Sequence, residues 1–322
     1  MRVLLTGAAG NLGRNLVPRL LERGHRLRTF DLPTPTNQSL LASFGAALET
    51  VWGDLRDPQA VMQAMRETEA VVHLGAITPP QSELEPEESR AVNVEGTQHV
   101  VAAARAQAQR PHLVFASSVA VYGREVGERL LDAESPLVAS DHYSAHKIAC
   151  EESVRASGSS YTILRLGISL PQRPSRGDPR WFSYLFEHAL DSRVHFVHPA
   201  DAAEALARSL EVPAAQGRIL CVAGGAGCQI TQRELLSEAL SAVGLGMLPE
   251  RAFGTRPLFG GWLDTLESQR VLGNYQRHSF RDFVASLRRS VGLGRFGVSL
   301  LSPFARGYVL RYSERYQRSR QP

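Results

Sequence analysis

Short apolar runs alternate with helical patterns along the first half of the chain. Arg2–Thr6 has the pattern of a buried strand, and a helical pattern follows it to Arg23, where Gly24 closes the helix. A second strand pattern covers Arg26–Phe30, and the alternation of strands and helices continues to Leu166. Regular alternation of this kind predicts an α/β fold with a doubly wound parallel sheet.

The turn after the first strand is rich in glycine, with the sequence Gly7-Ala8-Ala9-Gly10-Asn11-Leu12-Gly13. Glycines permit a tight turn and close backbone approach to a ligand. The N-terminus of the following helix offers unpaired N–H groups and a partial positive charge to a pyrophosphate. The order of strand, glycine turn and helix therefore predicts a dinucleotide site in a Rossmann-type fold.

Asp31 comes at the end of the second strand, 18 residues beyond Gly13. An acid near this distance binds the ribose hydroxyls of a dinucleotide, and its charge repels a 2′-phosphate. We therefore expect NAD as the cofactor. NADP is the alternative, because Arg14 could reach such a phosphate; a turn role before Pro33 is the structural alternative for Asp31.

The regular alternation of strand and helix patterns ends at Leu166. A Pro- and Arg-rich stretch covers Pro171–Arg180, and strand patterns at Val194–Val197 and Arg218–Val222 then flank a helical pattern over Asp201–Glu211. We expect both strands to return to the sheet, which leaves a small, discontinuous substrate region. The predicted parts are an NAD(P)-binding Rossmann domain at 1–166 plus 194–222, a substrate-binding region at 167–193 plus 223–293, and a basic amphipathic C-terminal tail at 294–322.

Thirty-six residues are Lys or Arg, and Lys147 is the only lysine among them. It follows Tyr143 by four positions, so the two side chains share one face of a helix. A fixed ammonium beside a phenol favours phenolate and makes the tyrosine a usable base near neutral pH. The alternative is an ordinary solvated lysine and a half-buried tyrosine on an amphipathic helix.

Further motifs resemble those of the short-chain dehydrogenase/reductase superfamily, in its extended branch, the NAD-dependent epimerase/dehydratase family. The glycine turn has that superfamily's Gly-x-x-Gly-x-x-Gly spacing. The matching segments after it are Gly53–Asp57, Ala70–Ala76, Asn93–Thr97 and Phe115–Gly123, and with the tyrosine–lysine pair they follow the family's order. The resemblance runs from residue 1 to about residue 285 and implies a Rossmann-type fold.

The resemblance implies roles for individual residues. Ser118 would be the catalytic serine, Tyr143 the acid/base and Lys147 its partner. His73 and His198 are interpreted as structural, and Asn93 as holding its helix and a loop in register. The residues expected to contact the cofactor are Gly7, Gly10, Asn11, Leu12, Gly13, Asp31, Asp54, Leu55, Leu74, Gly75, Ala76, Asn93, Tyr143 and Lys147.

The implied reaction is hydride transfer between NAD and a secondary alcohol or carbonyl of a sugar or small hydroxylated metabolite. Val119 and Ala120 stand where sugar-nucleotide dehydratases of the family carry an Asp-Glu pair, which argues against dehydration. Ile168 stands where epimerases usually carry an Asn that holds a nucleotide sugar. A UDP-sugar 4-epimerase therefore remains the alternative, and a non-catalytic NAD-binding redox sensor is a second one.

Composition restricts the partners and the compartment. The pI is about 9.2, but the net charge of +4 is small and the basic residues are scattered, so we do not expect nucleic-acid binding. We find neither a membrane-spanning apolar run nor a signal-peptide pattern. The three cysteines, Cys150, Cys221 and Cys228, have no metal-ligand spacing and leave one unpaired, which favours a reducing cytoplasm and no metal site.

Two expectations concern assembly and the tail. Family members usually pair through two helices per subunit, here about Arg90–Gln107 and Tyr143–Ala156, which predicts a homodimer. The tail interleaves six Arg with aromatic and leucine side chains. It could lie on a membrane surface, but a helix packed on the protein's own body or on a partner chain is the preferred interpretation.

Overall fold

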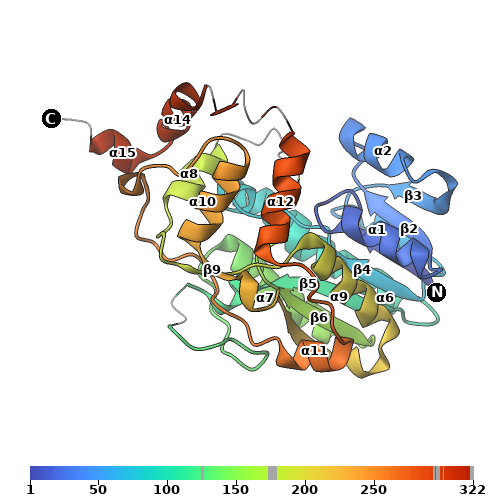
Figure 1. Ribbon diagram of the computed structural model, residues 1–322. Coiled ribbons are helices and arrows are strands. Elements are labelled where there is room, and N and C mark those ends of the chain that lie inside the picture. The colour runs from blue at the N-terminus through green and yellow to red at the C-terminus, as the bar shows by residue number, and fades with distance from the viewer. Residues whose placement is uncertain (125–126, 173–179, 293, 295–297, 300, 320–322) are drawn as a thin grey trace.

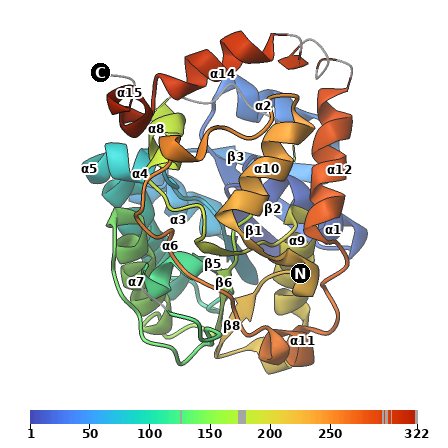
Figure 2. The same ribbon diagram turned by 60° about the vertical axis from the view of Figure 1, so that its left-hand side comes forward.

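Seven parallel strands form the central sheet of the computed structural model, which describes residues 1–124, 127–172, 180–292, 294, 298–299 and 301–319. The strand order is β3-β2-β1-β4-β5-β6-β8 (Figures 1 and 2). Their bounds are β1 Arg2–Thr6, β2 Arg26–Asp31, β3 Leu48–Trp52, β4 Ala70–His73, β5 His112–Ser118, β6 Tyr161–Leu166 and β8 Arg218–Val222. The order reverses between β1 and β4, which confirms the doubly wound fold; sheets of this kind bind ligands at the carboxyl ends of the strands where the order reverses.

Helices cover both faces of this sheet (Figures 1 and 2). The strands alternate their side chains between two cores, as the period of two requires: Val3 and Leu5 pack in one core, and Leu4 in the other. Complete burial of one such side chain stabilises the fold by about 1.5–3 kcal/mol. The helices of the first core are α1 Gly13–Glu22, α2 Pro35–Ala42, α9 Pro199–Glu211 and α11 Leu266–Leu272, and those of the second are α3 Pro58–Met65, α6 Gly96–Arg105 and α7 His142–Arg155.

A further core lies beyond the sheet, in the C-terminal half of the chain. Phe186, Phe196 and Phe283 are among its buried residues. Its elements are α8 Arg180–Phe186, β7 Arg193–His195, β9 Gln229–Thr231, α10 Gln232–Ala242 and α12 Phe280–Val291. This core packs the region expected to hold the substrate, although Leu272 and Tyr275 of that region join the core of the central sheet instead.

The prediction that Val194–Val197 joins the central sheet is wrong. β7 pairs antiparallel with β9 in a separate two-stranded sheet. The open edge of β6 is occupied by β8 along Thr162–Leu166, and Phe196, just after β7, bridges Ile168 beyond the end of β6. An apolar run predicts a buried strand but does not specify which edge it pairs with.

The tail packs on the protein's own body. Within its described part, α14 Ser302–Leu310 buries Val309 and Leu310 in the C-terminal core, and α15 Glu314–Arg318 follows it (Figure 2). The hydroxyl of Ser313 donates to the Ala252 carbonyl at 2.6 Å. This arrangement matches the preferred interpretation; Arg295 and Arg320 lie outside the described residues. Across the described helices, none is both long and apolar enough to cross a membrane.

Candidate active site

The glycine turn joins β1 to α1 at the carboxyl edge of the sheet. Gly7 has φ +72°, and a Cβ added there would lie 2.8 Å from the backbone nitrogen of Gly75. A Cβ on Gly13 would lie 2.3 Å from the Gly7 carbonyl oxygen. Only glycine fits these two positions, so the turn can be tight and the helix N-terminus can come close to a ligand.

The remaining residues of the turn belong to the start of α1. Leu12 occupies the N-cap position, where its carbonyl accepts from the backbone of Asn15 and Leu16. The carbonyl of Asn11 accepts from the Asn15 side chain. Gly10 N–H donates to the Gly7 carbonyl at 3.0 Å and closes the turn. These hydrogen bonds fix the conformation of the expected phosphate-binding segment.

Asp31 lies directly beside the turn. Its carboxylate accepts from Ala8 N–H at 2.9 Å and Ala9 N–H at 3.2 Å. Burial raises the pKa of Asp31 to about 6, and the two hydrogen bonds oppose that shift. Arg14 is the cation for which NADP was retained as the alternative cofactor. Its guanidinium donates to the carbonyls of Ala9 and Gly10.

The segment after β4 packs tightly against Leu55. A Cβ on Gly75 would lie 2.8 Å from the Leu55 side chain, and Gly75 N–H donates to the Thr6 hydroxyl at 3.1 Å. Leu74 packs partly buried against the core of the sheet. Ala76 follows Gly75 and precedes Ile77, which Asn93 holds by accepting from its N–H at 2.7 Å and donating to its carbonyl at 2.8 Å.

Two residues of this region, Asp54 and His73, bind other side chains of the chain. The Asp54 carboxylate, expected at the adenine, binds Arg56 at 2.6 Å, which holds the pKa of Asp54 below its usual range. His73 lies between the hydroxyls of Thr6, at 2.7 Å, and Thr97, at 3.0 Å. Burial lowers the pKa of His73 to about 3, so it stays neutral and structural.

The structure brings Ser118, Tyr143 and Lys147 together at the end of β5. Ser118 is the last residue of β5, and the other two lie one turn apart on α7. The Tyr143 phenol interacts with the Ser118 hydroxyl, which also accepts from Ala120 N–H at 3.2 Å. Lys147 is buried, and its ammonium lies 5.7 Å from the centroid of the Tyr143 ring.

The electrostatics of Tyr143 differ from the simple expectation. Burial raises the pKa of this phenol above its usual value of about 10, and the hydrogen bond to Ser118 lowers it. The Lys147 ammonium donates to the Ala116 carbonyl at 2.7 Å, and burial lowers its own pKa. Burial therefore outweighs the hydrogen bond from Ser118 to Tyr143, and the expected stabilisation of phenolate is not the dominant effect in this structure.

The neighbouring Ser117 has a different environment from Ser118. Its hydroxyl donates to Glu151 at 2.5 Å, and Glu151 binds Arg165 of β6 through two hydrogen bonds of 2.8 and 3.0 Å. Both charged side chains are 3% exposed. Sequence reasoning missed this buried pair, whose only signal is an acid on α7 and an Arg within an apolar strand. The pair fixes α7 against the sheet and leaves Ser118 as the hydroxyl beside Tyr143.

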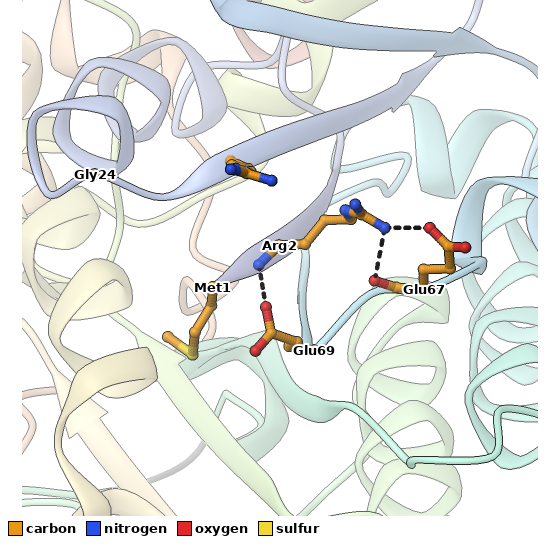
Figure 3. Close-up of a pocket in the computed structure, with 6 residues that line it drawn as sticks. Met1, Arg2, Gly24, Glu67 and Glu69 are labelled. Atoms are coloured by element: carbon orange, nitrogen blue, oxygen red, sulfur yellow. Dashed lines mark hydrogen bonds and ion pairs between the residues drawn. The ribbon is translucent and has the colours of Figure 1, made fainter.

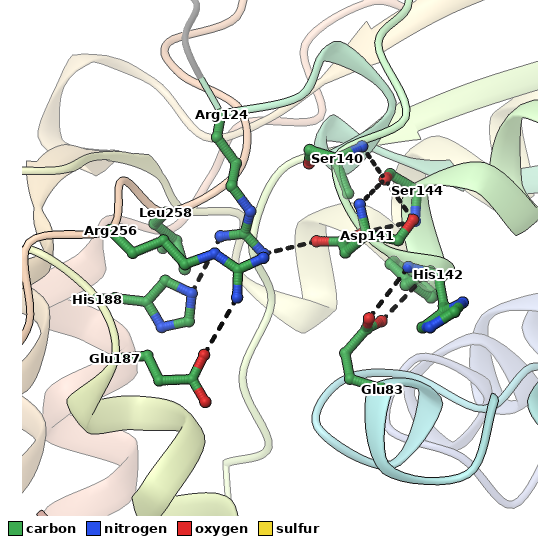
Figure 4. A network of polar contacts seen from close by, with 12 residues as sticks. Glu83, Arg124, Ser140, Asp141, His142, Ser144, Glu187, His188, Arg256 and Leu258 are labelled. Atoms are coloured by element: carbon green, nitrogen blue, oxygen red, sulfur yellow. Dashed lines mark hydrogen bonds and ion pairs between the residues drawn. The ribbon is translucent and has the colours of Figure 1, made fainter. Parts of the chain in front are cut away.

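A carboxylate from α4 Gln81–Leu84 holds the start of α7 (Figure 4). Glu83 accepts from the backbone N–H groups of His142 and Tyr143, each at 3.0 Å. Asp141 caps the same helix and forms a capping box with Ser144. The N–H groups at a helix start need acceptors, and two carboxylates supply them here. Glu83 was also not foreseen from the sequence.

A side-chain cluster outside this site contains His198, Asp201 and His278, whose potential ligand atoms lie within 4.8 Å of one another. His278 binds Asp201 at 2.6 Å, and Asp201 also accepts from the backbone of Arg277 and His278. The His198 side chain caps α9 by accepting from Ala200 N–H. The cluster joins the start of α9 to the segment before α12, as a structural role for His198 predicts.

Two cavities lined by described residues lie away from the catalytic residues. One, of about 430 Å³, is lined by Met1, Arg2, Gly24, Arg26, Glu67 and Glu69, at the amino ends of β1 and β2 (Figure 3). The other, of about 560 Å³, lies beside β6 and β8 and includes Tyr161 and Cys221 among its lining residues. Ligands of doubly wound sheets bind at the opposite, carboxyl edge, so neither cavity is the candidate site.

Sequence comparison matches residues 3–223 to the NAD dependent epimerase/dehydratase family. A 3-beta-hydroxysteroid dehydrogenase of Mycolicibacterium neoaurum is 32% identical over 206 residues, which cover 60% of this chain and 53% of that protein. The chain thus spans about half the length of this relative. A 2-alkyl-3-oxoalkanoate reductase of Stenotrophomonas maltophilia is 30% identical, with 76% of each chain covered.

Solved structures share the fold. The UDP-glucose 4-epimerase of Thermus thermophilus, in complex with NAD, superposes with a TM-score of 0.72 at 24% identity, over 90% of this chain and 98% of that one. A short-chain dehydrogenase/reductase superfamily protein of Agrobacterium tumefaciens, with bound NAD, gives a TM-score of 0.71 at 23% identity, over 95% and 100%. At these identities the likeness concerns the fold.

Proposed function

Because this chain belongs to the NAD-dependent epimerase/dehydratase family, we propose that it is an NAD-dependent oxidoreductase acting on a secondary alcohol or its carbonyl form. The observation that carries the proposal is the convergence of Ser118, Tyr143 and Lys147 at the carboxyl end of β5, on the edge of the sheet that also bears the glycine turn. The family is described as NAD dependent epimerases and dehydratases, and relatives bear the names 3-beta-hydroxysteroid dehydrogenase and uronate dehydrogenase, which supports an enzyme of this class.

The described residues fit NAD. The cradle at Gly7 and Gly13, which a Cβ would fill, would receive the pyrophosphate at the N-terminus of α1. Asp31 would accept from the adenine ribose hydroxyls, and Lys147 would donate to the nicotinamide ribose. Bound NAD supplies the hydride acceptor. The engagement of Arg14 with two turn carbonyls supports NAD over NADP.

The proton is handled by the chain's own side chains. Ser118 would hold the substrate oxygen, and the Tyr143 phenol oxygen would accept the proton of the substrate hydroxyl as hydride leaves the carbon. Lys147, fixed by the Ala116 carbonyl, would stabilise the phenolate form of Tyr143. In the direction of reduction, the same phenol donates its proton to the carbonyl oxygen.

The proposed substrate is a sugar or a small hydroxylated metabolite without a nucleotide. Relatives bearing the names uronate dehydrogenase, from Pseudomonas syringae, and 2-alkyl-3-oxoalkanoate reductase support this class. Ile168 supports it as well, because it packs against two apolar clusters and bridges Phe196 through its backbone. An apolar residue so placed offers no hydrogen bond to a nucleotide sugar.

The second candidate is a UDP-sugar 4-epimerase, favoured by the similarity in fold to UDP-glucose 4-epimerase over 90% of the chain. The two candidates differ in the fate of the reduced cofactor. An epimerase retains NADH until hydride returns, whereas a dehydrogenase releases it. Both require that Tyr143 and Lys147 work as described, so mutation of these residues alone does not separate them.

The test mixes the purified protein with excess NAD and a panel of free sugars, polyols, hydroxy acids and UDP-sugars. We expect steady accumulation of NADH, measured by its near-ultraviolet absorbance, with a compound that lacks a nucleotide. If the protein interconverts a UDP-sugar without accumulating NADH, and converts none of the other compounds, the epimerase is established instead. A protein that binds NAD but converts no compound of any class would fit a redox sensor.

We further propose a cytoplasmic homodimer. Three buried, free cysteines suit a reducing compartment. Pairing would use α6 and α7, which pack together on one face of the sheet and expose small side chains such as Ala102 and Ala145. A sedimentation measurement at micromolar concentration checks this, and a strictly monomeric mass would contradict it.

A further inference from the structure

The C-terminal helix α14 packs on the protein with one face and leaves the other exposed. Its inner face buries Val309 and Leu310 in the C-terminal core. Leu301, at the N-cap of the helix, and Phe304 are 59% and 79% exposed. In Figures 1 and 2, α14 lies at the outer edge of the molecule. Contact of such large apolar side chains with water is unfavourable, so this face is a candidate contact surface.

Helical spacing places these exposed side chains on one face of α14. Leu301 and Phe304 are three positions apart, and Arg311 follows Phe304 by seven positions, which is close to two turns of helix. Arg311 is the C-cap residue, has helical backbone angles and is exposed. Gly307, which lies between Phe304 and Arg311 on this face, adds no side chain. Since α14 contains no acidic residue, its outward face is apolar and basic.

The net positive charge of the chain lies in the tail around this helix. Residues 294–322 hold six arginines and a single acidic residue, Glu314, whereas the whole chain has a net charge of only +4. Glu314 is paired with Arg318 of α15 at 3.0 Å. Arg311 and Arg315 are exposed, and neither forms an ion pair with a described residue. Their charges are therefore available to an anionic partner.

An exposed aromatic side chain lies at the same end of the molecule. Trp181 of α8 is exposed, and its neighbour Phe182 packs on Tyr312, with 6.0 Å between the ring centroids. Tyr312 lies between α14 and α15. Trp side chains are enriched where apolar and aqueous phases meet, because the ring is apolar and its N–H is polar. Trp181 thus adds an amphipathic group beside the tail.

Three kinds of partner differ in how they fit an apolar and basic face. A second copy of this chain would bring the same arginines together, because a two-fold contact pairs a surface with itself. A nucleic acid would neutralise the arginines but would offer no matching apolar surface to Leu301. An anionic membrane meets both requirements, since acyl chains receive Leu301 and Phe304 while lipid head groups attract the arginines.

We propose that the outward face of α14, with the exposed Arg311 and Arg315 at its C-terminal end, binds peripherally to a membrane surface rich in anionic lipids. The helix lies in the plane of the interface and keeps Val309 and Leu310 in the C-terminal core. This binding concerns where the protein is held and does not depend on the proposed oxidoreductase function.

Co-sedimentation of the full-length protein with lipid vesicles tests the proposal. Vesicles of equal parts phosphatidylcholine and phosphatidylglycerol are anionic, and vesicles of phosphatidylcholine alone have no net charge. We expect a partition coefficient at least about tenfold higher for the anionic vesicles, which falls severalfold as NaCl rises from about 50 to about 500 mM, because salt screens the arginines. Equal partition into both kinds of vesicle, or binding to neither, would overturn the proposal.

Two matched pairs of variants separate the apolar contact from the charge. Leu301→Ser should lower the partition coefficient for anionic vesicles about fivefold, whereas Leu266→Ser, 73% exposed on α11 at the opposite end of the molecule, should not change it (Figures 1 and 2). Arg311→Gln should also lower it about fivefold, and Arg66→Gln, exposed after α3, should not. Circular dichroism checks that all four variants fold. Equal binding by the two members of each pair would overturn the proposal.

Two further outcomes would assign this face to another partner and overturn membrane binding. One is binding to duplex DNA, but not to vesicles, that Arg311→Gln weakens. The other is a dimer that Leu301→Ser dissociates, again without binding to vesicles. NADH formation is measured separately, in the absence of vesicles, so a failure of the proposed oxidoreductase function leaves the vesicle result intact.

Discussion

Tyr143 combines burial with a phenol that must change its protonation state. We predict that Tyr143→Phe lowers kcat at least a hundredfold and leaves the dissociation constant for NAD nearly unchanged, because only the proton-transferring hydroxyl is lost. Lys147→Met should lower kcat and also weaken NAD binding, since the Lys147 ammonium is proposed to bind the nicotinamide ribose. Steady-state kinetics and NAD titration measure the two effects, with Tyr308→Phe as the control. Retention of most activity by Tyr143→Phe would contradict the mechanism.

Asp31 makes cofactor selection dependent on pH. Its folded-state pKa is raised to about 6, so the carboxylate loses its charge as the pH falls through that value. We predict that NAD binds at least tenfold more tightly than NADP at pH 8, about 1.4 kcal/mol, and that the difference narrows below pH 6. Titrations of both nucleotides at pH 8 and pH 5 check this. In Asp31→Asn, the affinities for NAD and NADP should differ little at either pH. If the wild-type preference for NAD over NADP did not change with pH, the role of Asp31 would be contradicted.

Sequence analysis identifies residues that belong to a local motif and misses those that act across the fold. Ser118, Tyr143 and Lys147 are recognisable because a serine strand and a tyrosine–lysine helix have fixed local spacing. Glu83, on α4, and Arg165, on β6, lie on other elements than Tyr143 and are ordinary surface residue types in isolation. Their roles depend on burial and on which backbone groups they meet, and neither property can be read from spacing.

At the scale of elements, helix α7 carries the catalytic pair and begins at two carboxylates. We predict that Glu83→Ala lowers the free energy of unfolding by about 1–2 kcal/mol, because two N–H groups at the helix start lose their acceptor. It should also lower kcat by shifting Tyr143. Urea unfolding and kinetics measure these effects.

Glu87→Ala, at an exposed position of α5 Pro86–Arg90, provides the control for that substitution. It removes a carboxylate of the same type that has no role at α7. If the Glu83 and Glu87 variants were equally stable and equally active, the positioning role of Glu83 would be wrong.

The elements of the central sheet were predictable because each buried strand and its following helix have a clear local period. The pattern at 194–197 predicted a strand but not its partner. Pairing was decided by Arg218–Val222, which occupies the free edge of β6, and by the antiparallel match between Val194 and Ile230. Such choices depend on contacts between distant segments, so hydrophobic periodicity alone does not fix them.

At the scale of the whole molecule, buried neutral histidines connect stability to pH. Burial lowers the pKa of His188, His195 and His198 to about 4. In the unfolded chain the value is about 6.5, so the unfolded state takes up protons first as the pH falls. Their contribution to stability is therefore complete above about pH 6.5 and is lost progressively toward about pH 4.

We predict a lower free energy of unfolding at pH 5 than at pH 7.5, measured by urea titration. His195 accepts from Leu263 N–H and donates to the Gly224 carbonyl, two bonds that only its neutral form can make together. His195→Gln should reduce the pH dependence of the free energy of unfolding by the equivalent of at most one bound proton. An unchanged slope in the His195 variant would refute this account.

The burial of Lys147 has a consequence for proteolysis. Since it is the only lysine and is 5% exposed within α7, a lysine-specific endoprotease can cut this chain at a single bond, and only when α7 opens. The rate of appearance of fragments 1–147 and 148–322 then reports how often the catalytic helix unfolds. A ligand that binds only the closed form slows that cleavage in proportion to its occupancy. The rate of cleavage after Lys147 can therefore measure the binding of a ligand without any assay of activity.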